Sequence, residues 1–369
     1  MRTLATGCAA VLLAACTTVG PGSPITTPAP ATGQPGAASS AWPIETREDV
    51  DLWLHSYAMI SDDTTQVPFF KRGYREQMLA FKRRANVRTK LDDNYDRLHD
   101  GLAQHPGYVS GQFLPLYFGS WQDMQRAISL FLEADGNPQR ATDQQTQAII
   151  ATFASVFPTA ADRAWLQTFT ASVEDEDAQY YHDYWTARQR DLAPVRARVD
   201  SLWQNVYLAK LAPYLNNEQL DRGILYLSLP LDGEGRTITG RATTEQGNSR
   251  ITVTFPQTPD AALDAIYVVA HEAIGRVANS AVQDNTTPAE QRSGATNHYT
   301  SAAAVRGGAL LLKHVAPELV AGYARYYLSS ANAAFTGNDP EGALAQAFPL
   351  PQPILTGLDH QIALVLGGI

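Results

Sequence analysis

The stretch that decides the fold is "RITVTFPQTPDAALDAIYVVAHEAIGRVANS", residues 250–280. Its first six residues alternate apolar with polar side chains, which predicts a β-strand with one buried face. After Pro256 the apolar residues recur three or four apart, and this spacing predicts an amphipathic helix over 260–282. Thr258 suits the N-cap and Pro259 the first helical position. We therefore expect a strand that leads directly into a helix.

The flanking sequence extends this unit in both directions. Upstream, "GILYLSLPL" (223–231) predicts a buried strand, and "RTITGRATT" (236–244) predicts a strand that pairs with 250–255 through a turn at Gly247-Asn248. Downstream, two more helices are expected at 299–315 and 317–335. The sequence therefore predicts a small sheet or hairpin followed by several helices.

The rest of the chain after the first 41 residues is expected to be helical. From Thr46 to about Leu220 amphipathic patterns follow one another, separated by Pro and Gly. The predicted fold class is thus mostly α (α+β). It divides into a helical region, 42–222, and an α+β region, 223–369.

His271 and Glu272 are the residues of the decisive helix that could carry chemistry. By physical chemistry alone, Glu272 lies four residues before Arg276, the favourable order for a helical ion pair. A glycine inside a helix usually reflects close packing or a ligand, so Gly275 would admit a neighbouring helix. His271 would then be hydrogen-bonded to protein groups only.

The order of strand, hairpin and His-Glu helix resembles the gluzincin branch of the zincin-like metallopeptidases. Their helix reads His-Glu-x-x-His, in which both histidines bind zinc and the glutamate activates water. The resemblance implies that His271 is a zinc ligand and Glu272 the general base, but Gly275 stands where the second histidine belongs. His298 and Glu290 are the nearest later candidates for the missing ligands.

Two hypotheses follow from this incomplete zinc-binding motif. In the first, a divergent zinc metallopeptidase uses His271, His298 and Glu290 as ligands, and Glu272 as base. In the second, the domain is a metal-free, non-catalytic descendant that serves as a binding or assembly module. Because a lost ligand usually costs more than a rearrangement restores, the second hypothesis is preferred.

The N-terminus predicts where in the cell the protein is located. "MRTLATGCAAVLLAAC" (1–16) has one basic residue and then an apolar run too short to span a bilayer, which is typical of a secretory signal. The ending Leu13-Ala14-Ala15-Cys16 resembles the lipobox of bacterial lipoproteins. This resemblance implies removal of a signal peptide, 1–15, and a covalent lipid such as palmitate on Cys16.

The lipid would anchor the protein to a membrane of the cell envelope. Thr17, in place of the aspartate associated with inner-membrane retention, indicates the periplasmic face of the outer membrane in a Gram-negative cell. Residues 17–41 contain five prolines and no charge. Such a composition cannot bury a core, so we expect 16–41 to be a lipidated, disordered tether.

Composition excludes several other classes of function. The only cysteines are Cys8 and Cys16, so no thiol remains in the predicted domain for a disulfide, a Cys metal site or a Cys nucleophile. A formal charge of −9 argues against nucleic acid as a partner. The membrane, through the anchor, is the expected partner, and the sequence identifies no protein or peptide that binds.

Three further patterns are predicted to be structural. The basic run at 81–90 and the acidic run at 174–177 are expected to be solvated helix faces. The aromatic group of residues 180–185 is expected to pack in the interior, and the paired glycines 307–308 to form a packing notch.

Overall fold

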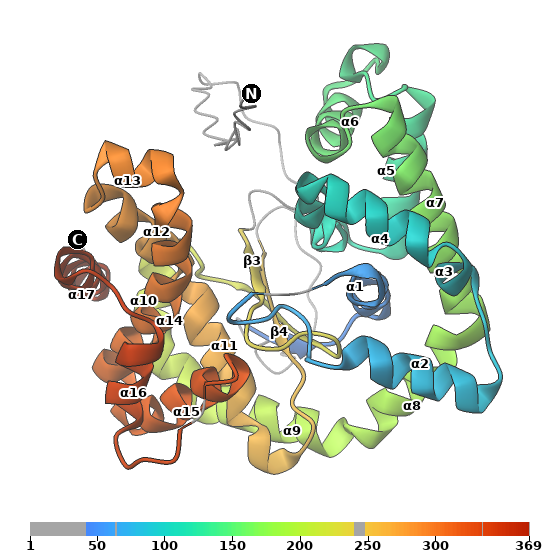
Figure 1. The fold of residues 1–369 in the computed structure, drawn as a ribbon. Coiled ribbons are helices and arrows are strands. Elements are labelled where there is room, and N and C mark those ends of the chain that lie inside the picture. The colour runs from blue at the N-terminus through green and yellow to red at the C-terminus, as the bar shows by residue number, and fades with distance from the viewer. Residues whose placement is uncertain (1–41, 63–64, 240–247, 334, 369) are drawn as a thin grey trace, which may run out of the picture. The chain divides into compact units, whose positions relative to one another are not determined.

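The computed structural model describes residues 42–62, 65–239, 248–333 and 335–368. These residues belong to one compact unit, which runs from Ser40 to Ile369. The fold is mostly helical with one small sheet, as expected from the sequence. Its centre is the sheet, with helices on both faces (Figure 1).

Helices fill most of the region, 42–222, that the sequence predicted to be helical. They are α1 (Glu48–Ile60), α2 (Tyr74–Ala85), α3 (Lys90–Asp93), α4 (Tyr95–Gln104), α5 (Trp121–Glu133), α6 (Gln144–Val156), α7 (Ala160–Glu176), α8 (His182–Asp191), α9 (Ala193–Leu202) and α10 (Leu208–Asn217). Two π-helical turns, η4 (Asp177–Tyr181) and η5 (Trp203–Tyr207), interrupt the later helices. Short 3₁₀ helices are η1 (Pro106–Gly111), η2 (Leu114–Tyr117) and η3 (Pro138–Arg140).

The sheet has four strands in the order β1-β2-β4-β3. They are β1 (Ile44–Glu45), β2 (Gly223–Ser228), β3 (Arg236–Ile238) and β4 (Ser249–Thr254). The expected antiparallel pair is present, since β3 runs antiparallel to β4. The turn predicted at Gly247-Asn248 lies mostly outside the described residues. β2 pairs with β4 in parallel, and so does β1 with β2.

The decisive stretch forms the predicted elements, but its helix is divided. β4 leads through η6 (Pro259–Ala261) into α11 (Leu263–Ala273), and the Thr258 hydroxyl caps η6 by accepting from the Ala261 N–H. The helix expected over 260–282 breaks at Ile274, and α12 (Gly275–Asp284) continues the chain.

The remaining helices follow α12. They are α13 (Pro288–Ser293), α14 (Ala295–Val315), η7 (Pro317–Leu319), α15 (Val320–Ser330), α16 (Pro340–Ala347) and α17 (Gln352–Gly367). Gly307 and Gly308 lie within α14, and a β-carbon on Gly307 would come within 2.8 Å of Ile274. The predicted packing notch is confirmed.

β4 is buried on both faces, which corrects the prediction of one buried face. Ile251 and Val253 belong to a hydrophobic cluster with the helices from α9 onward, whereas Tyr226 and Ile238 of neighbouring strands belong to a second cluster with α1 to α7. The polar residues that alternate along β4 therefore face protein and not water. Arg250 donates to the carbonyl oxygens of Leu116 and Phe118 on that side.

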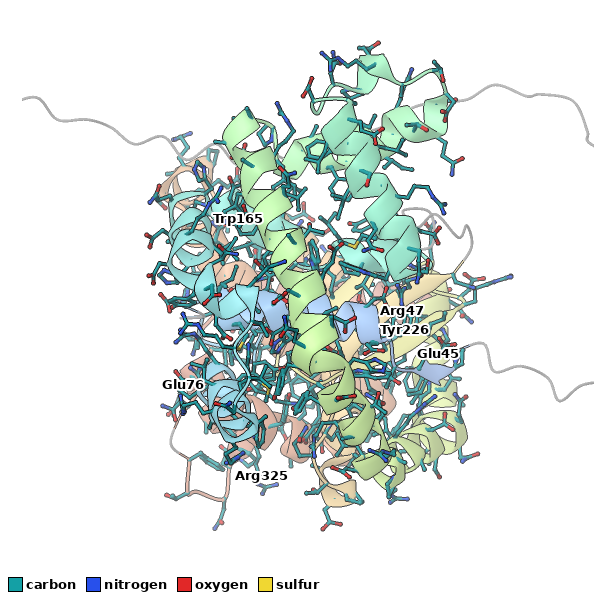
Figure 2. All side chains as sticks on the ribbon, turned by 90° about the vertical axis from the view of Figure 1, so that its right-hand side faces the viewer. Glu45, Arg47, Glu76, Trp165, Tyr226 and Arg325 are labelled. Atoms are coloured by element: carbon teal, nitrogen blue, oxygen red, sulfur yellow. The ribbon has the colours of Figure 1, made fainter. Side chains whose placement is uncertain are left out.

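The edge of the sheet is also covered by polar contacts. The guanidinium carbon of Arg47, just after β1, lies 5.7 Å from the centre of the Tyr226 ring (Figure 2). The same guanidinium donates to the carbonyl oxygen of Phe118 at 2.9 Å. These contacts tie the start of α1 to the sheet.

A segment of the helical region is paired with the loop that follows β2. Asp232 N–H donates to Phe69 O at 2.8 Å, and Lys71 N–H donates to Pro230 O at 2.9 Å. The Lys71 ammonium group donates to the carbonyl oxygens of Leu229 and Phe255, at 2.7 and 3.0 Å. This pairing holds the loop between β2 and β3 in place, and that loop carries a residue of the candidate site.

Candidate cation site

Three acidic or imidazole side chains meet where the loop between β2 and β3 faces α11. They are Glu234 from the loop and His271 and Glu272 from the helix, and one ligand atom from each lies within 4.8 Å of the others. His271 is 2% exposed, and the two carboxylates are partly buried. The group has the composition and spacing of a site that could hold a metal ion.

Hydrogen bonds orient the three side chains. His271 Nε2 lies 3.0 Å from a carboxylate oxygen of Glu234 and 4.0 Å from one of Glu272. The Gly235 N–H donates to Glu272 at 3.0 Å. The imidazole therefore lies between two carboxylates, one of which is held by the backbone of the loop.

Gly235 makes this close approach possible. A β-carbon at this position would overlap the carbonyl oxygen of Thr252 and lie 3.1 Å from Glu272 Cγ. Any larger residue would push the loop away from the β4 backbone and crowd Glu272, which would disturb the hydrogen bond between Gly235 and Glu272. The loop can carry Glu234 to the helix because its next residue has no side chain.

Tyr327 of α15 braces the site from the other side. Its ring stacks on the His271 ring with centroids 5.2 Å apart, and its hydroxyl donates to Gly233 O at 3.0 Å. One buried side chain thus contacts both the helix residue and the loop. This arrangement restricts the rotamer of His271 by packing.

Charge and burial act on the protonation of the cluster. Burial alone would lower the pKa of His271, but the charge of Glu234 and its hydrogen bond, with the charge of Glu272, raise it above its ordinary value. Burial raises the pKa of Glu272, and Glu234 adds to this, against the opposing charges of His271 and Arg236. Both shifts follow from the close approach of the imidazole and the carboxylates in a place with little water, where a cation would bind.

The structure does not bring the other predicted ligands to His271. Glu290 caps α13, where its carboxylate accepts from the Thr287 N–H at 2.8 Å. His298 is exposed on α14. Neither is in a group of metal-ligating atoms within the described residues. Glu290 is held in the capping box of α13, and His298 lies on the exposed face of α14.

The predicted ion pair between Glu272 and Arg276 is wrong. Arg276 instead donates to Glu218 at 2.7 and 2.8 Å. The break at Ile274 interrupts the regular helical spacing between the two residues, and Glu272 is held by Gly235. Gly275 does not admit a neighbouring helix either, because a β-carbon there would have nothing within 4 Å.

Glu234 is the site residue that the sequence prediction missed. It stands in "GEG", residues 233–235, between the end of one strand pattern and the start of the next. A charged residue between two glycines in such a loop indicates a close backbone approach, and this signal could have found it. Its partner His271 is 37 residues away in the sequence, so the contact between the two residues cannot be inferred from the sequence pattern.

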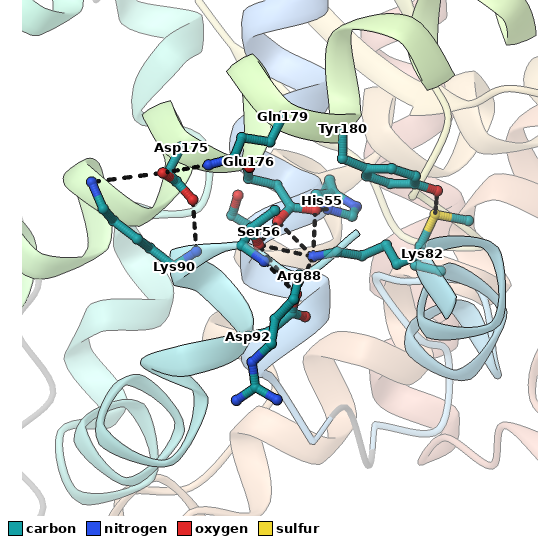
Figure 3. Close-up of polar contacts among 12 residues, drawn as sticks. His55, Ser56, Lys82, Arg88, Lys90, Asp92, Asp175, Glu176, Gln179 and Tyr180 are labelled. Atoms are coloured by element: carbon teal, nitrogen blue, oxygen red, sulfur yellow. Dashed lines mark hydrogen bonds and ion pairs between the residues drawn. The ribbon is translucent and has the colours of Figure 1, made fainter. Parts of the chain in front are cut away.

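A second polar cluster lies in the helical region, and it corrects two predictions (Figure 3). Lys82 of the basic run and Glu176 of the acidic run were expected to face water, but they are 2% and 0% exposed. The Lys82 ammonium lies 2.7 Å from Glu176 Oε2 and 3.0 Å from Glu176 Oε1, and His55 Nε2 lies 3.1 Å from Oε1. The network lies mostly in the core, although Asp92, which pairs with Lys82 at 2.6 Å, is 16% exposed, and we assign the network a structural role.

The aromatic group of residues 180–185 packs inside, as predicted. Tyr180 and Tyr181 are buried, and Tyr181 lies against the His55 ring with centroids 4.4 Å apart.

Comparison with family models, with curated proteins and with solved structures finds no match to this chain. In the described part of the chain, no helix has the length and apolar character that crossing a bilayer requires.

Proposed function

We propose that this protein is a lipid-anchored component of the cell envelope whose folded domain binds a divalent transition-metal cation, with Zn²⁺ as the best match, and acts as a non-catalytic binding module. The observation that carries the proposal is the cluster of Glu234, His271 and Glu272. One imidazole nitrogen and two carboxylates form a ligand set that zinc accepts.

The number of groups argues against catalysis. A catalytic zinc ion takes three protein ligands, keeps one position for water, and needs a separate base to accept the proton. The cluster offers three groups in all. If Glu272 is a ligand, the cluster supplies no base. If Glu272 is the base, His271 and Glu234 are two ligands where three are required.

The second nitrogen of His271 bears on the affinity of the site. A histidine that binds a metal almost always donates its other ring N–H to a carboxylate, a carbonyl group or water, which orients the ring. The Nδ1 atom of His271 is buried and has no hydrogen-bond partner among the described residues. Packing against Tyr327 orients the ring instead, and we expect modest affinity for the cation.

The metal is tested by analysis of the purified protein without residues 1–39, beside His271→Ala and Glu234→Gln. We expect each of these two variants to hold about one zinc per chain less than the parent does. His298→Ala is the matched control, because it removes an exposed histidine outside the cluster. Equal zinc content in all four proteins would refute the site.

The anchor is tested separately. We expect the full chain to incorporate labelled palmitate in bacterial cells and to fractionate with the outer membrane. Cys16→Ser should abolish both, because the acceptor thiol is gone. A Cys8→Ser variant, which changes the other cysteine, should behave like the parent. Labelling that persists in Cys16→Ser would exclude this anchor.

The alternative is a divergent zinc-dependent metallopeptidase with Glu272 as general base. It is favoured by the position of Glu272 beside His271, with its carboxylate held toward the sheet by the Gly235 N–H. On this hypothesis zinc-loaded protein cleaves peptides, and Glu272→Gln abolishes cleavage while zinc content is kept. Absence of cleavage by the zinc-loaded parent across a peptide library supports the non-catalytic function.

A further inference from the structure

We propose that the protein has a second divalent-cation site, formed by Glu48, Asp177 and His182. One ligand atom from each of these residues lies within 4.8 Å of the others. His182 Nδ1 is 2.8 Å from a carboxylate oxygen of Glu48, although the two residues are 134 positions apart. The site shares no residue with the first cluster and does not depend on the proposed function.

The π-helical turn η4 explains why Asp177 and His182 face the same way. In an α-helix, two residues five positions apart point in directions that differ by about 140°. In η4 the His182 N–H donates to Asp177 O, the wider hydrogen-bonding pattern of a π-turn. This turn brings the two side chains onto one side of the helix. Such turns occur frequently at functional sites.

A second, independent observation concerns the carboxylate of Asp177. The Oδ1 atom of Asp177 is buried and accepts no hydrogen bond from the described residues. A carboxylate oxygen removed from water without a partner is costly. Burial raises the pKa of Asp177, and the neighbouring charge of Glu48 raises it further, against the opposing charge of His182. A bound cation would supply the missing partner and offset the repulsion between the two carboxylates.

The ligand set selects the class of cation. Ca²⁺ and Mg²⁺ prefer ligands that are all oxygen, whereas an imidazole nitrogen with two carboxylates suits Zn²⁺. The His182 side chain is 62% exposed and that of Glu48 is 28% exposed, so water can complete the coordination. Bound zinc would join the first turn of α1 to the π-turn that follows α7.

The test uses the full chain with His271→Ala, a substitution that removes the imidazole ligand of the first cluster. The protein is stripped of metal by a chelator and titrated with Zn²⁺ by calorimetry. We expect one equivalent of zinc to bind, and millimolar Mg²⁺ not to compete. Adding His182→Ala or Asp177→Asn should weaken binding at least about tenfold. Both substitutions are in polar, partly exposed positions, and the melting temperature without zinc checks that the fold is kept.

His314→Ala is the matched control on the same background. His314 also forms a partly exposed pair with an acid, Asp359, at 3.0 Å, but no third ligand lies beside it among the described residues. This variant should bind zinc like its parent. The proposal is overturned if the His271→Ala protein binds no zinc, or if His182→Ala and Asp177→Asn bind it as tightly as His314→Ala does.

Discussion

The buried carboxylate of Glu218 accepts two hydrogen bonds from the guanidinium group of Arg276, at 2.7 and 2.8 Å. Truncating Arg276 to alanine leaves a buried charge without this partner. We expect a loss of about 1 kcal/mol of stability, the lower end of the usual cost, because the Arg276 side chain is 67% exposed and water can approach. Urea denaturation of Arg276→Ala measures this loss.

A double-mutant cycle then separates the observed pair from the pair expected from sequence. Arg276→Ala with Glu218→Gln should show coupling, since both remove one interaction. Arg276→Ala with Glu272→Gln should be additive, because Glu272 is bound to the Gly235 N–H. Coupling in the second cycle and additivity in the first would show that the structure assigns the wrong partner.

At the scale of elements, the break between α11 and α12 makes Gly275 replaceable. A β-carbon there meets nothing within 4 Å, and the residue does not have a positive φ. Gly275→Ala should therefore stabilise the protein, by about 0.5–1 kcal/mol, through the better helix propensity of alanine. Thermal and urea unfolding measure the gain.

Gly308 in α14 is the matched comparison for Gly275. A β-carbon there would overlap the buried hydroxyl of Tyr323, which donates to Val305 O at 2.9 Å. Gly308→Ala should destabilise the protein by about 1–3 kcal/mol, the usual cost of overpacking. If Gly275→Ala were the more harmful of the two, α12 would be packed differently from the structure described above.

The contact between α2 and α7 depends on a buried ion pair. Lys82→Met should cost about 3–5 kcal/mol, because it leaves the Glu176 carboxylate without its closest cation. Lys90→Met is the control: Lys90 is 60% exposed in its pair with Asp175 at 3.6 Å, so the loss should be at most about 1 kcal/mol. Similar losses in the two variants would contradict the buried position of Lys82.

For the whole molecule, the same network predicts lability to acid. Burial would raise the pKa of Glu176, but His55 and Lys82 outweigh it and lower this pKa to about 2. A depressed folded-state pKa contributes stability that is present above the ordinary value of 4.5 and lost as pH falls toward 2. Burial lowers the pKa of His55 in the folded protein. Below about pH 6.5 the unfolded chain therefore binds a proton at this histidine more readily than the folded protein does, which also lowers stability.

Urea midpoints measured from pH 7 to pH 3 test this prediction. Stability of the parent should fall steadily over this range, and more steeply below pH 4.5, the ordinary pKa of Glu176. The Glu176→Gln variant should be less stable than the parent at pH 7. Below pH 4.5 its stability should fall less steeply with pH, because the titrating carboxylate is gone. Parallel curves for the two proteins would mean that Glu176 does not control the acid transition.

Much of the local structure could be predicted from the sequence. The strand at 250–255, the Thr258 cap and the helix that begins beyond Pro259 follow from periodicity and capping, which act over a few residues. Two of the three residues of the candidate site, His271 and Glu272, were found because they are adjacent in the sequence. The helix break at Ile274 was not predicted, because Gly275 alone does not terminate a helical pattern.

The sequence by itself determined the kinds of elements, their order and the mostly helical class, since these depend on the side chains of one segment at a time. Only the tertiary structure decided the partners: Glu234 for His271, Glu218 for Arg276, and Glu176 for Lys82. These pairs are 37, 58 and 94 residues apart. The physical reason is that burial removes water as the alternative partner of a charged group. Which side chain replaces water then depends on how distant segments pack.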